Sequence, residues 1–300
     1  MKIIKKSKIM EQSLNRKMLI ERKVLLENKN PFIVNLKYSF QTEKKLYLVM
    51  EYCKGGELYS YIAKYKKFPI EIAKFICAEV ILGLQYLHEK MQIMYRDLKP
   101  ENILITEDGH LKIADFGLGK SIKDENQVTF SFLGTPEYIA PEIIKCKQSF
   151  EKNGYTLKCD IWAFGILLYE LINGQPPFTN PQRNWNVIMK QILNNNPIFN
   201  SDFNDDSIDL IKKCLNTEPK QRPNWTEIRI HPFFLNIDWE GIYMQKYESP
   251  LRQFITQKKV KLQRPKPILE TPIEDYNINL PNINGFTYDP QTLPNKISIL

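Results

Sequence analysis

Three short segments of this 300-residue chain contain side chains that could do chemistry. They are residues 95–102 (YRDLKPEN), 115–117 (DFG) and 140–142 (APE), and they follow one another within fewer than fifty residues. Carboxylate and amide oxygens are the ligands that magnesium prefers, and cationic side chains balance the charge of phosphate groups. Taken singly, such residues are more often part of an ordinary loop or turn. Taken together, such side chains could bind a metal ion and a phosphate-bearing substrate.

In this order, the three segments resemble the catalytic-loop, metal-binding and activation-segment signatures of the protein kinase superfamily. Phosphoryl transfer depends on positioning and on cancelling phosphate charge rather than on covalent chemistry. The resemblance implies that Asp97 accepts the proton of the substrate hydroxyl and that Lys99 lies beside the transferred phosphate. It also implies that Asn102 and Asp115 bind magnesium, so we expect ATP and Mg²⁺ as cofactors.

Further features resemble the AGC branch of serine/threonine protein kinases. Tyr95 stands where kinases usually have histidine, SFLGTPEYIAPE occupies residues 131–142, and the tail contains INGFTY at residues 283–288. The resemblance extends over essentially the whole chain. It implies transfer of the ATP γ-phosphate to serine or threonine of protein substrates.

The resemblance also implies where the base of ATP binds. Met50 would be the gatekeeper, and the backbone of Glu51 to Cys53 would form the hinge that binds adenine. Leu104 would lie beneath the base. Met50 and Leu104 are equally typical of an ordinary core, and a residue can serve in both ways.

A buried ion pair is expected near the N-terminus. Glu21 falls on the same helical stripe as Leu14, Met18 and Leu25, where an unpaired carboxylate would be costly. Kinases place a strand lysine opposite such a glutamate, and Lys2 matches that lysine and would contact the phosphates. The alternative is a fraying N-terminal lysine, with Glu21 on a solvent edge.

Ser131 matches the activation-loop phosphosite of AGC kinases, which implies an upstream activating kinase. A phosphate there would add strong acceptor oxygens and nearly two negative charges. Arg96, Lys120 and Lys17 match the basic pocket that receives it. Because Arg96 precedes Asp97, that contact would fix the catalytic loop. The alternative is a surface serine among unrelated cations.

Four further residues match supporting positions of the family. Thr135 would brace the catalytic loop. Asp160 would bond the backbone of that loop, although an aspartate in a first helical turn is also a common helix-dipole device. Glu142 and Arg222 match a buried ion pair.

Three glutamates match positions where basophilic AGC kinases bind arginine upstream of the acceptor: Glu57, Glu101 and Glu170. A carboxylate and a guanidinium can form two parallel charge-assisted hydrogen bonds. We therefore expect substrates with an Arg-x-x-Ser/Thr pattern or a close relative of it. Any one of the three glutamates could instead be a solvated surface charge.

The tail contains a candidate hydrophobic motif at residues 286–288, with Ile283 where the family usually has phenylalanine. Phe286 would dock in a groove beside the glutamate-bearing helix, and the residues that match its walls are Lys6, Ile9, Met10 and Leu46. Thr287 and Thr271 are candidate phosphosites, the second in a Thr-Pro step. The alternative is a plain disordered tail.

No G-x-G-x-x-G occurs in the sequence, and the resemblance implies two strands before Lys2. One interpretation is a truncated record of an active kinase. The other is a catalytically impaired kinase-like scaffold or pseudokinase, because the missing segment would cover the phosphates with backbone N–H groups. A third, weaker interpretation makes the basic residues 258–266 a membrane or nucleic-acid binder.

Hydrophobic periodicity predicts a few strands followed by a mostly helical body. Strands are predicted at residues 36–40, 46–50, 103–106 and 111–114, the last two joined by a hairpin turn at Asp108-Gly109. Helices are predicted at residues 14–27, 70–90, 160–173, 184–193, 205–215 and 225–231. The expected fold is α+β, a two-lobed protein kinase fold with a reduced N-terminal lobe and an AGC-type tail. Its expected parts are residues 1–52 and 53–234 for the lobes of the catalytic domain (1–234), and 235–300 for the tail.

Composition sets the remaining expectations. A net charge of +8 fits nucleic acid, acidic membrane or a solvated lysine-rich surface, and we favour the last. Five cysteines without a CxxC pair argue against a disulfide framework or a zinc site and for a reducing compartment. The N-terminus is too charged for a secretory signal. We expect a cytoplasmic monomer, with the nucleus as the alternative location, no nucleic-acid partner and at most peripheral membrane contact.

Overall fold

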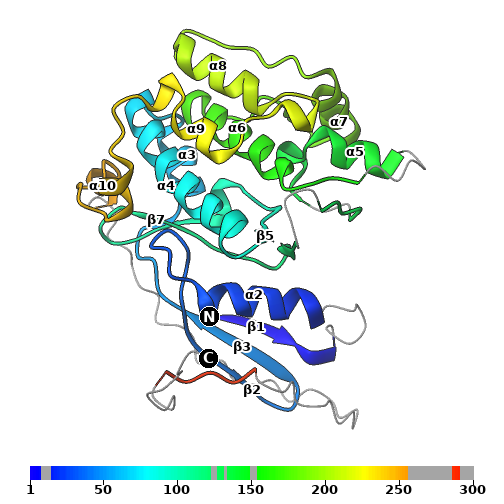
Figure 1. Cartoon of the computed structure of the whole chain (residues 1–300), viewed down its shortest axis with the longest axis vertical. Helices are drawn as coiled ribbons and strands as arrows, with labels where there is room; N and C mark the ends of the chain where they lie inside the picture. Colours follow the sequence, from blue (N-terminus) through cyan, green and yellow to red (C-terminus); the bar gives the residue numbers. More distant parts are fainter. Residues whose placement is uncertain (8–14, 123–126, 132–133, 149–153, 256–285, 291–300) are drawn as a thin grey trace.

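The computed structural model describes residues 1–7, 15–122, 127–131, 134–148, 154–255 and 286–290, with the backbone alone at residues 15–17, 147 and 148. Within them, a small sheet with one helix lies beside a larger helical body (Figure 1). This is the two-lobed α+β arrangement that the sequence predicts.

The small lobe is an antiparallel sheet of three strands in the order β1-β3-β2. Its strands are β1 (Lys2–Lys5), β2 (Leu36–Gln41) and β3 (Lys45–Met50). Helix α2 (Asn15–Glu27) follows β1 and buries Met18 and Leu25, two members of the predicted apolar stripe. Because α2 packs its apolar stripe inward, Glu21 on that stripe is also buried and needs a partner.

The edge of β2 is covered by the C-terminal segment 286–290. Ser39 and Tyr288 exchange two backbone hydrogen bonds, of 3.0 and 2.7 Å, as an antiparallel bridge. Pairing an edge strand removes a row of unpaired backbone groups. Segments more than 240 residues apart in the chain therefore lie side by side (Figure 1).

Phe286 is fully buried, as the predicted docking of the tail requires. Its carbonyl accepts hydrogen bonds from Ser39 Oγ at 2.6 Å and from Arg22 Nε at 2.8 Å. Of the predicted groove walls, Lys6 and Leu46 are buried. Ile9, Met10, Ile283 and Thr271 lie outside the described residues.

The helical body forms around α4 (Ile70–Glu89) and α6 (Lys158–Asn173), which contribute the largest share of its buried side chains. The helices around them are α3 (Leu58–Tyr65), α5 (Pro141–Gln148), α7 (Trp185–Asn194), α8 (Asp205–Cys214), α9 (Trp225–Arg229), α10 (Trp239–Tyr243) and α11 (Arg252–Ile255). Short 3₁₀ helices occupy Pro100–Asn102, Pro136–Tyr138, Pro219–Gln221 and Pro232–Phe234.

Two small sheets lie where the lobes meet (Figure 1). One joins β4 (Gly56–Glu57), β6 (Ile103–Ile105) and β7 (Leu111–Ile113), and the other joins β5 (Ile93–Met94) and β8 (Lys120–Ser121). Gly109 in the β6–β7 turn has φ +90°, a conformation that glycine adopts without steric cost. The predicted Asp108-Gly109 hairpin is therefore present.

The strands and helices predicted at residues 36–50, 70–90, 103–114 and 160–231 are present, with ends within two residues of the expected ones. The short helices α3, α5, α10 and α11 were not predicted. The beginning of the predicted tail packs against the body rather than leaving it. Ser249 Oγ donates to the Gly109 carbonyl at 2.7 Å, and the Phe254 ring lies 4.7 Å from that of Tyr65.

Candidate active site

The β6–β7 hairpin brings the two predicted metal ligands together. Strand β6 begins directly after Asn102, and β7 ends two residues before Asp115. Because Ile103 pairs with Ile113, the two side chains emerge at the same end of the hairpin. The Ala114 N–H also donates to the Asn102 carbonyl at 2.9 Å.

Three predicted catalytic-loop and activation-segment residues converge on the carboxylate of Asp97. Asp97 Oδ2 accepts a hydrogen bond from Asn102 Nδ2 at 2.7 Å and lies 3.1 Å from Lys99 Nζ. Asp97 Oδ1 accepts from Thr135 Oγ1 at 3.3 Å, and Lys99 Nζ donates to the same hydroxyl at 2.9 Å. These contacts fix the direction of the Asp97 side chain from three sides.

Lys2 joins the small lobe to this loop. Its Nζ lies 2.7 Å from Glu21 Oε1 and 3.0 Å from Asp115 Oδ1. Burial lowers the pKa of Lys2, but the two carboxylates outweigh burial and raise it. Burial likewise raises the pKa of Asp115, whereas the Lys2 charge and hydrogen bond bring it below its ordinary value. For Glu21, burial outweighs Lys2 and raises the pKa of the carboxyl. The 2.7 Å contact and the charged ammonium favour an ion pair here.

The residues fit a magnesium ion that also binds phosphate oxygens. Asn102 directs its amide nitrogen at Asp97, so its amide oxygen is the atom that can bind a cation. The Asp115 carboxylate is half exposed. Among the described residues there is no group of three His, Cys, Asp or Glu side chains that could hold a metal. Magnesium needs no such group, because it uses one or two protein oxygens together with phosphates and waters.

The backbone of the catalytic loop is held by Asp160. Its carboxylate accepts hydrogen bonds from the Tyr95 and Arg96 N–H groups, each at 2.8 Å. Arg96 has φ +68° and Asp115 has φ +52°. Non-glycine residues in this left-handed region are strained and persist where surrounding contacts determine them. Asp160 supplies such contacts for Arg96.

The Arg96 side chain reaches the predicted phosphosite through a tyrosine that the sequence analysis missed. Arg96 Nη1 donates to the Tyr155 hydroxyl at 3.1 Å, and that hydroxyl donates to the Ser131 carbonyl at 2.6 Å. Burial raises the pKa of Tyr155 to about 12, so the hydroxyl keeps its proton. The Ser131 residue is exposed.

The other predicted cations of this pocket are less completely described. Lys120 Nζ donates to Thr129 Oγ1 at 2.6 Å, two residues before Ser131. Burial and the neighbouring Arg96 charge lower the pKa of Lys120. Lys17 is in α2, and its side chain lies outside the described residues.

The predicted adenine-binding residues lie between the lobes. Met50 ends β3 and Leu104 lies in β6, and both are partly buried against the core. The Glu51 carboxylate is turned away from the hinge backbone, since it binds Lys112 Nζ at 2.9 Å and the Asn35 N–H at 2.8 Å. Burial raises the pKa of the Cys53 thiol to about 11. Its side chain is therefore a neutral, buried group, and the hinge would act through its backbone.

A cavity of about 590 Å³ is lined by two of the three predicted arginine-binding acids, Glu101 and Glu170. Glu137 and the cations Lys66 and Arg183 also line it. The sequence analysis missed Glu137, although it follows Thr135 by two residues. Glu57 is exposed on β4 and does not line this cavity. Glu101, Glu137 and Glu170 together offer acceptor oxygens for a positively charged ligand.

Glu170 is the buried member of this acidic group, with Tyr138 donating a hydrogen bond to its carboxylate. Burial raises the pKa of Glu170 to about 7 although the Tyr138 hydrogen bond lowers it, and the charges of Glu101 and Glu137 add to the rise. A guanidinium beside it would favour the charged form.

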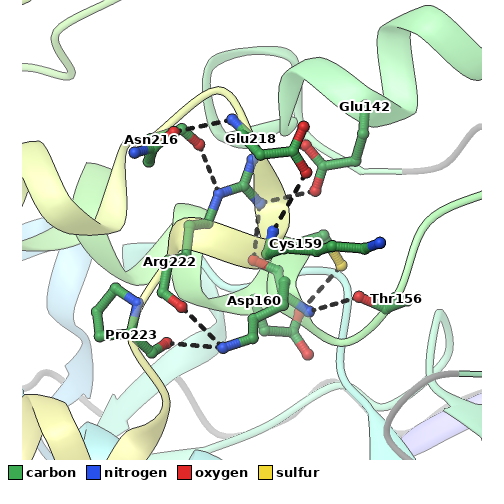
Figure 2. Close-up of polar contacts among 10 residues, drawn as sticks. Glu142, Thr156, Cys159, Asp160, Asn216, Glu218, Arg222 and Pro223 are labelled. Carbon is green, nitrogen blue, oxygen red and sulfur yellow. Dashed lines mark hydrogen bonds and ion pairs between the residues drawn. The ribbon is translucent and has the colours of Figure 1, made fainter.

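The predicted ion pair of Glu142 and Arg222 is bidentate, with Nη1–Oε1 and Nη2–Oε2 distances of 2.7 Å (Figure 2). The Arg222 side chain is fully buried and also donates to the carbonyls of Asn216 and Lys158. Glu142 is in the first turn of α5, at the end of the activation segment. The pair therefore fastens this segment to the loop before α9.

Of the predicted phosphosites in the tail, Thr287 is exposed next to the buried Phe286, and Thr271 is outside the described residues. In the part of the chain that the structure describes, no helix is long and apolar enough to cross a bilayer.

The chain is similar to known proteins over most of its length. The family model for the protein kinase domain matches residues 1–234. A RAC family serine/threonine-protein kinase homolog of Dictyostelium discoideum is 40% identical over 256 residues, 83% of this chain and 55% of the relative. The serine/threonine protein kinase ypkA of Aspergillus fumigatus is 42% identical over 258 residues, 84% of this chain and 39% of the relative. A cAMP-dependent protein kinase catalytic subunit of Dictyostelium discoideum is 40% identical over 255 residues, 83% of this chain and 38% of the relative. The chain thus spans about half the length, or less, of these relatives.

Proposed function

Because this chain belongs to the protein kinase family, as a serine/threonine kinase of the AGC type, we propose that it transfers the γ-phosphate of ATP to serine or threonine in protein segments with arginine upstream of the acceptor. The observation that carries this proposal is the convergence of Asn102, Lys99 and Thr135 on the Asp97 carboxylate. A carboxylate aimed in this way can orient an alcohol and accept its proton.

In this proposal Asp97 accepts the proton of the substrate hydroxyl, and Thr135 and Asn102 hold its carboxylate in place. Lys99 lies beside the same carboxylate and balances the charge of the transferred phosphate. Asn102 and Asp115 would hold Mg²⁺, which neutralises charge on the phosphates when it is bound.

The nucleotide would occupy the region between the lobes. Lys2 contacts its phosphates, and Glu21 fixes the direction of Lys2 through their 2.7 Å contact. The backbone of Glu51 to Cys53 binds the adenine edge, and Met50 and Leu104 pack against the ring. This assignment follows the family pattern and the half-buried state of both apolar side chains.

Substrate choice would come from the acidic cavity. Glu101 and Glu170 bind upstream arginines of the peptide, and Glu137 adds negative charge to the same hollow. Glu57 is exposed outside it, where it can meet a more distant arginine. AGC kinases are in general regulated by upstream kinases. Here the proposed phosphosites are Ser131, whose pocket would be Arg96, Lys120 and Lys17, and the tail threonines Thr271 and Thr287.

We further propose that the chain acts as a monomer in the cytoplasm. All five cysteines are free, which suits a reducing compartment. Its cationic surface then serves solubility rather than nucleic-acid binding.

The test uses two peptides that differ only in upstream arginine or alanine, with magnesium and ATP. Replacing arginine should lower kcat/KM by about tenfold to a hundredfold, as expected for a lost charged hydrogen bond. Glu170→Gln should remove most of this discrimination. Glu71→Gln, an exposed acid on α4, should leave it unchanged. Equal rates on both peptides would exclude the arginine preference, and no transfer to any peptide would exclude the kinase activity.

A further inference from the structure

A chain of buried hydrogen bonds runs from α9 toward the catalytic loop. The indole Nε1–H of Trp225 donates to His88 Nδ1 at 2.9 Å. On the other side of the ring, His88 Nε2 lies 2.7 Å from Asp160 Oδ2. Trp225, His88 and Asp160 are 3%, 5% and 0% exposed, so little water competes for these contacts.

The hydrogen bond from Trp225 determines which ring nitrogen of His88 carries the proton. An indole N–H can only donate, so His88 Nδ1 must accept. The proton of the neutral ring is then on Nε2, where it points at the Asp160 carboxylate. The tautomer of a histidine is set by the hydrogen bond at its other nitrogen, and here that bond comes from Trp225.

The Asp160 carboxylate connects His88 to the backbone of the two residues before Asp97. Its Oδ2 accepts from His88 and from the Tyr95 N–H, and its Oδ1 accepts from the Arg96 N–H. The Arg96 peptide has φ +68°, a conformation that relaxes when its contacts are lost. A rotated Asp160 carboxylate would therefore release the residue next to Asp97.

We propose that Trp225 is a positioning residue for phosphoryl transfer: its indole N–H fixes the His88 tautomer, which orients Asp160 and thereby the Tyr95 and Arg96 peptides. The inference rests on the proposed function, because the catalytic role of Asp97 belongs to it. The other interpretation is a purely packing role for Trp225, whose ring lies 5.8 Å from that of Phe164.

The test compares Trp225→Phe with Phe164→Leu in the full chain. Trp225→Phe keeps an aromatic ring but removes the N–H. Phe164→Leu disturbs the same ring contact and leaves both hydrogen bonds of His88 in place. The ring nitrogens of His88 are read by ¹H–¹⁵N spectroscopy, and the signals of three histidines can be assigned by single replacement. Amide hydrogen exchange at Tyr95 and Arg96 and the kcat for a peptide complete the measurements.

In the unaltered chain, His88 should be protonated at Nε2 alone. Trp225→Phe should change the Nδ1 signal, speed exchange at Tyr95 and Arg96, and lower kcat by about threefold to tenfold with the KM values unchanged. Below its unfolding temperature, Phe164→Leu should leave the Nδ1 signal, the exchange at Tyr95 and Arg96, and kcat unchanged. A proton on Nδ1 in the unaltered chain, or equal exchange in the two variants, overturns the proposal. Spectra and exchange decide it even if no peptide is phosphorylated, so its failure is separable from that of the kinase assignment.

Discussion

Lys2 Nζ lies 3.0 Å from Asp115 Oδ1, and this contact joins the first strand of the small lobe to the loop that follows β7. The same ammonium lies 2.7 Å from Glu21 on α2. One side chain thus meets two carboxylates that are 94 positions apart in the sequence. Lys2 therefore links the position of α2 to that of the Asp115 loop.

Replacing Lys2 by methionine should therefore weaken the use of ATP. The variant loses the ammonium that we propose to contact the phosphates of ATP, and a hydrogen bond to a charged group contributes about 1.5 to 3 kcal/mol. We expect kcat/KM for ATP to fall by about tenfold or more. Lys5→Met, on the exposed face of the same strand, is the matched control. Steady-state kinetics over a range of ATP concentrations measures both variants. An equal loss of kcat/KM in the two would show that Lys2 has no role in the use of ATP.

Replacing Asp97 by asparagine should abolish efficient turnover while the fold is retained. Asparagine keeps the size and the acceptor oxygen that Asn102 needs but cannot take a proton. General-base catalysis contributes about 10²- to 10⁴-fold, so kcat should fall by that factor. Asp108→Asn, in the exposed β6–β7 turn, should keep its activity. Thermal unfolding of both variants checks the fold, and full activity of Asp97→Asn would refute the proposed mechanism.

Glu170 should make stability depend on pH in a direction opposite to that of an ordinary ion-paired acid. Burial raises its pKa to about 7 against an ordinary 4.5, although the Tyr138 hydrogen bond lowers it. Between these values the unfolded chain has lost the proton and the folded chain still holds it. Stability therefore falls as pH rises through this window.

Glu170→Gln removes that loss, because glutamine stays neutral and still accepts from Tyr138. The variant should gain stability relative to the unaltered chain as pH rises from about 4.5 to 7, by at most roughly 3 kcal/mol. Urea unfolding at several pH values measures the difference. Glu71→Gln, at a largely exposed position, should show no such trend. A constant difference between the Glu170→Gln variant and the unaltered chain across this pH range would contradict the raised pKa.

Local turn chemistry made part of the site predictable from sequence. Asp108-Gly109 predicts the hairpin, and the hairpin register alone brings Asn102 and Asp115 to one end. Periodicity placed Glu21 on a buried stripe, but its partner Lys2 and the pair Glu142–Arg222 were expected because the motifs resemble those of a known family. No local pattern links residues 80 positions apart.

The contacts that the sequence analysis missed share one physical property. Trp225 reaches His88 across 137 positions, and Tyr155 links Arg96 to Ser131 across the activation segment. In the sequence, each of these aromatic residues is typical of an ordinary core position. In the structure its ring is buried, and a single polar atom makes the contact. Periodicity identifies the buried face of a helix but not the partner of that single atom. The short helices α3 and α5 were missed because eight residues give too few turns for a clear period.

Breaking the Glu142–Arg222 pair should cost more than breaking an exposed one. In Arg222→Met the Glu142 carboxylate would remain nearly buried without its bidentate partner. Removing one partner of a buried pair costs about 3 to 5 kcal/mol, largely because a charge is left unpaired. The free energy of unfolding in urea should fall by that amount, and adding Glu142→Gln to Arg222→Met should recover part of it. Arg252→Met, which breaks the exposed contact with Glu248, should cost at most about 1 kcal/mol. If the two single variants lose equal stability, the pair does not fasten the activation segment to the helical body.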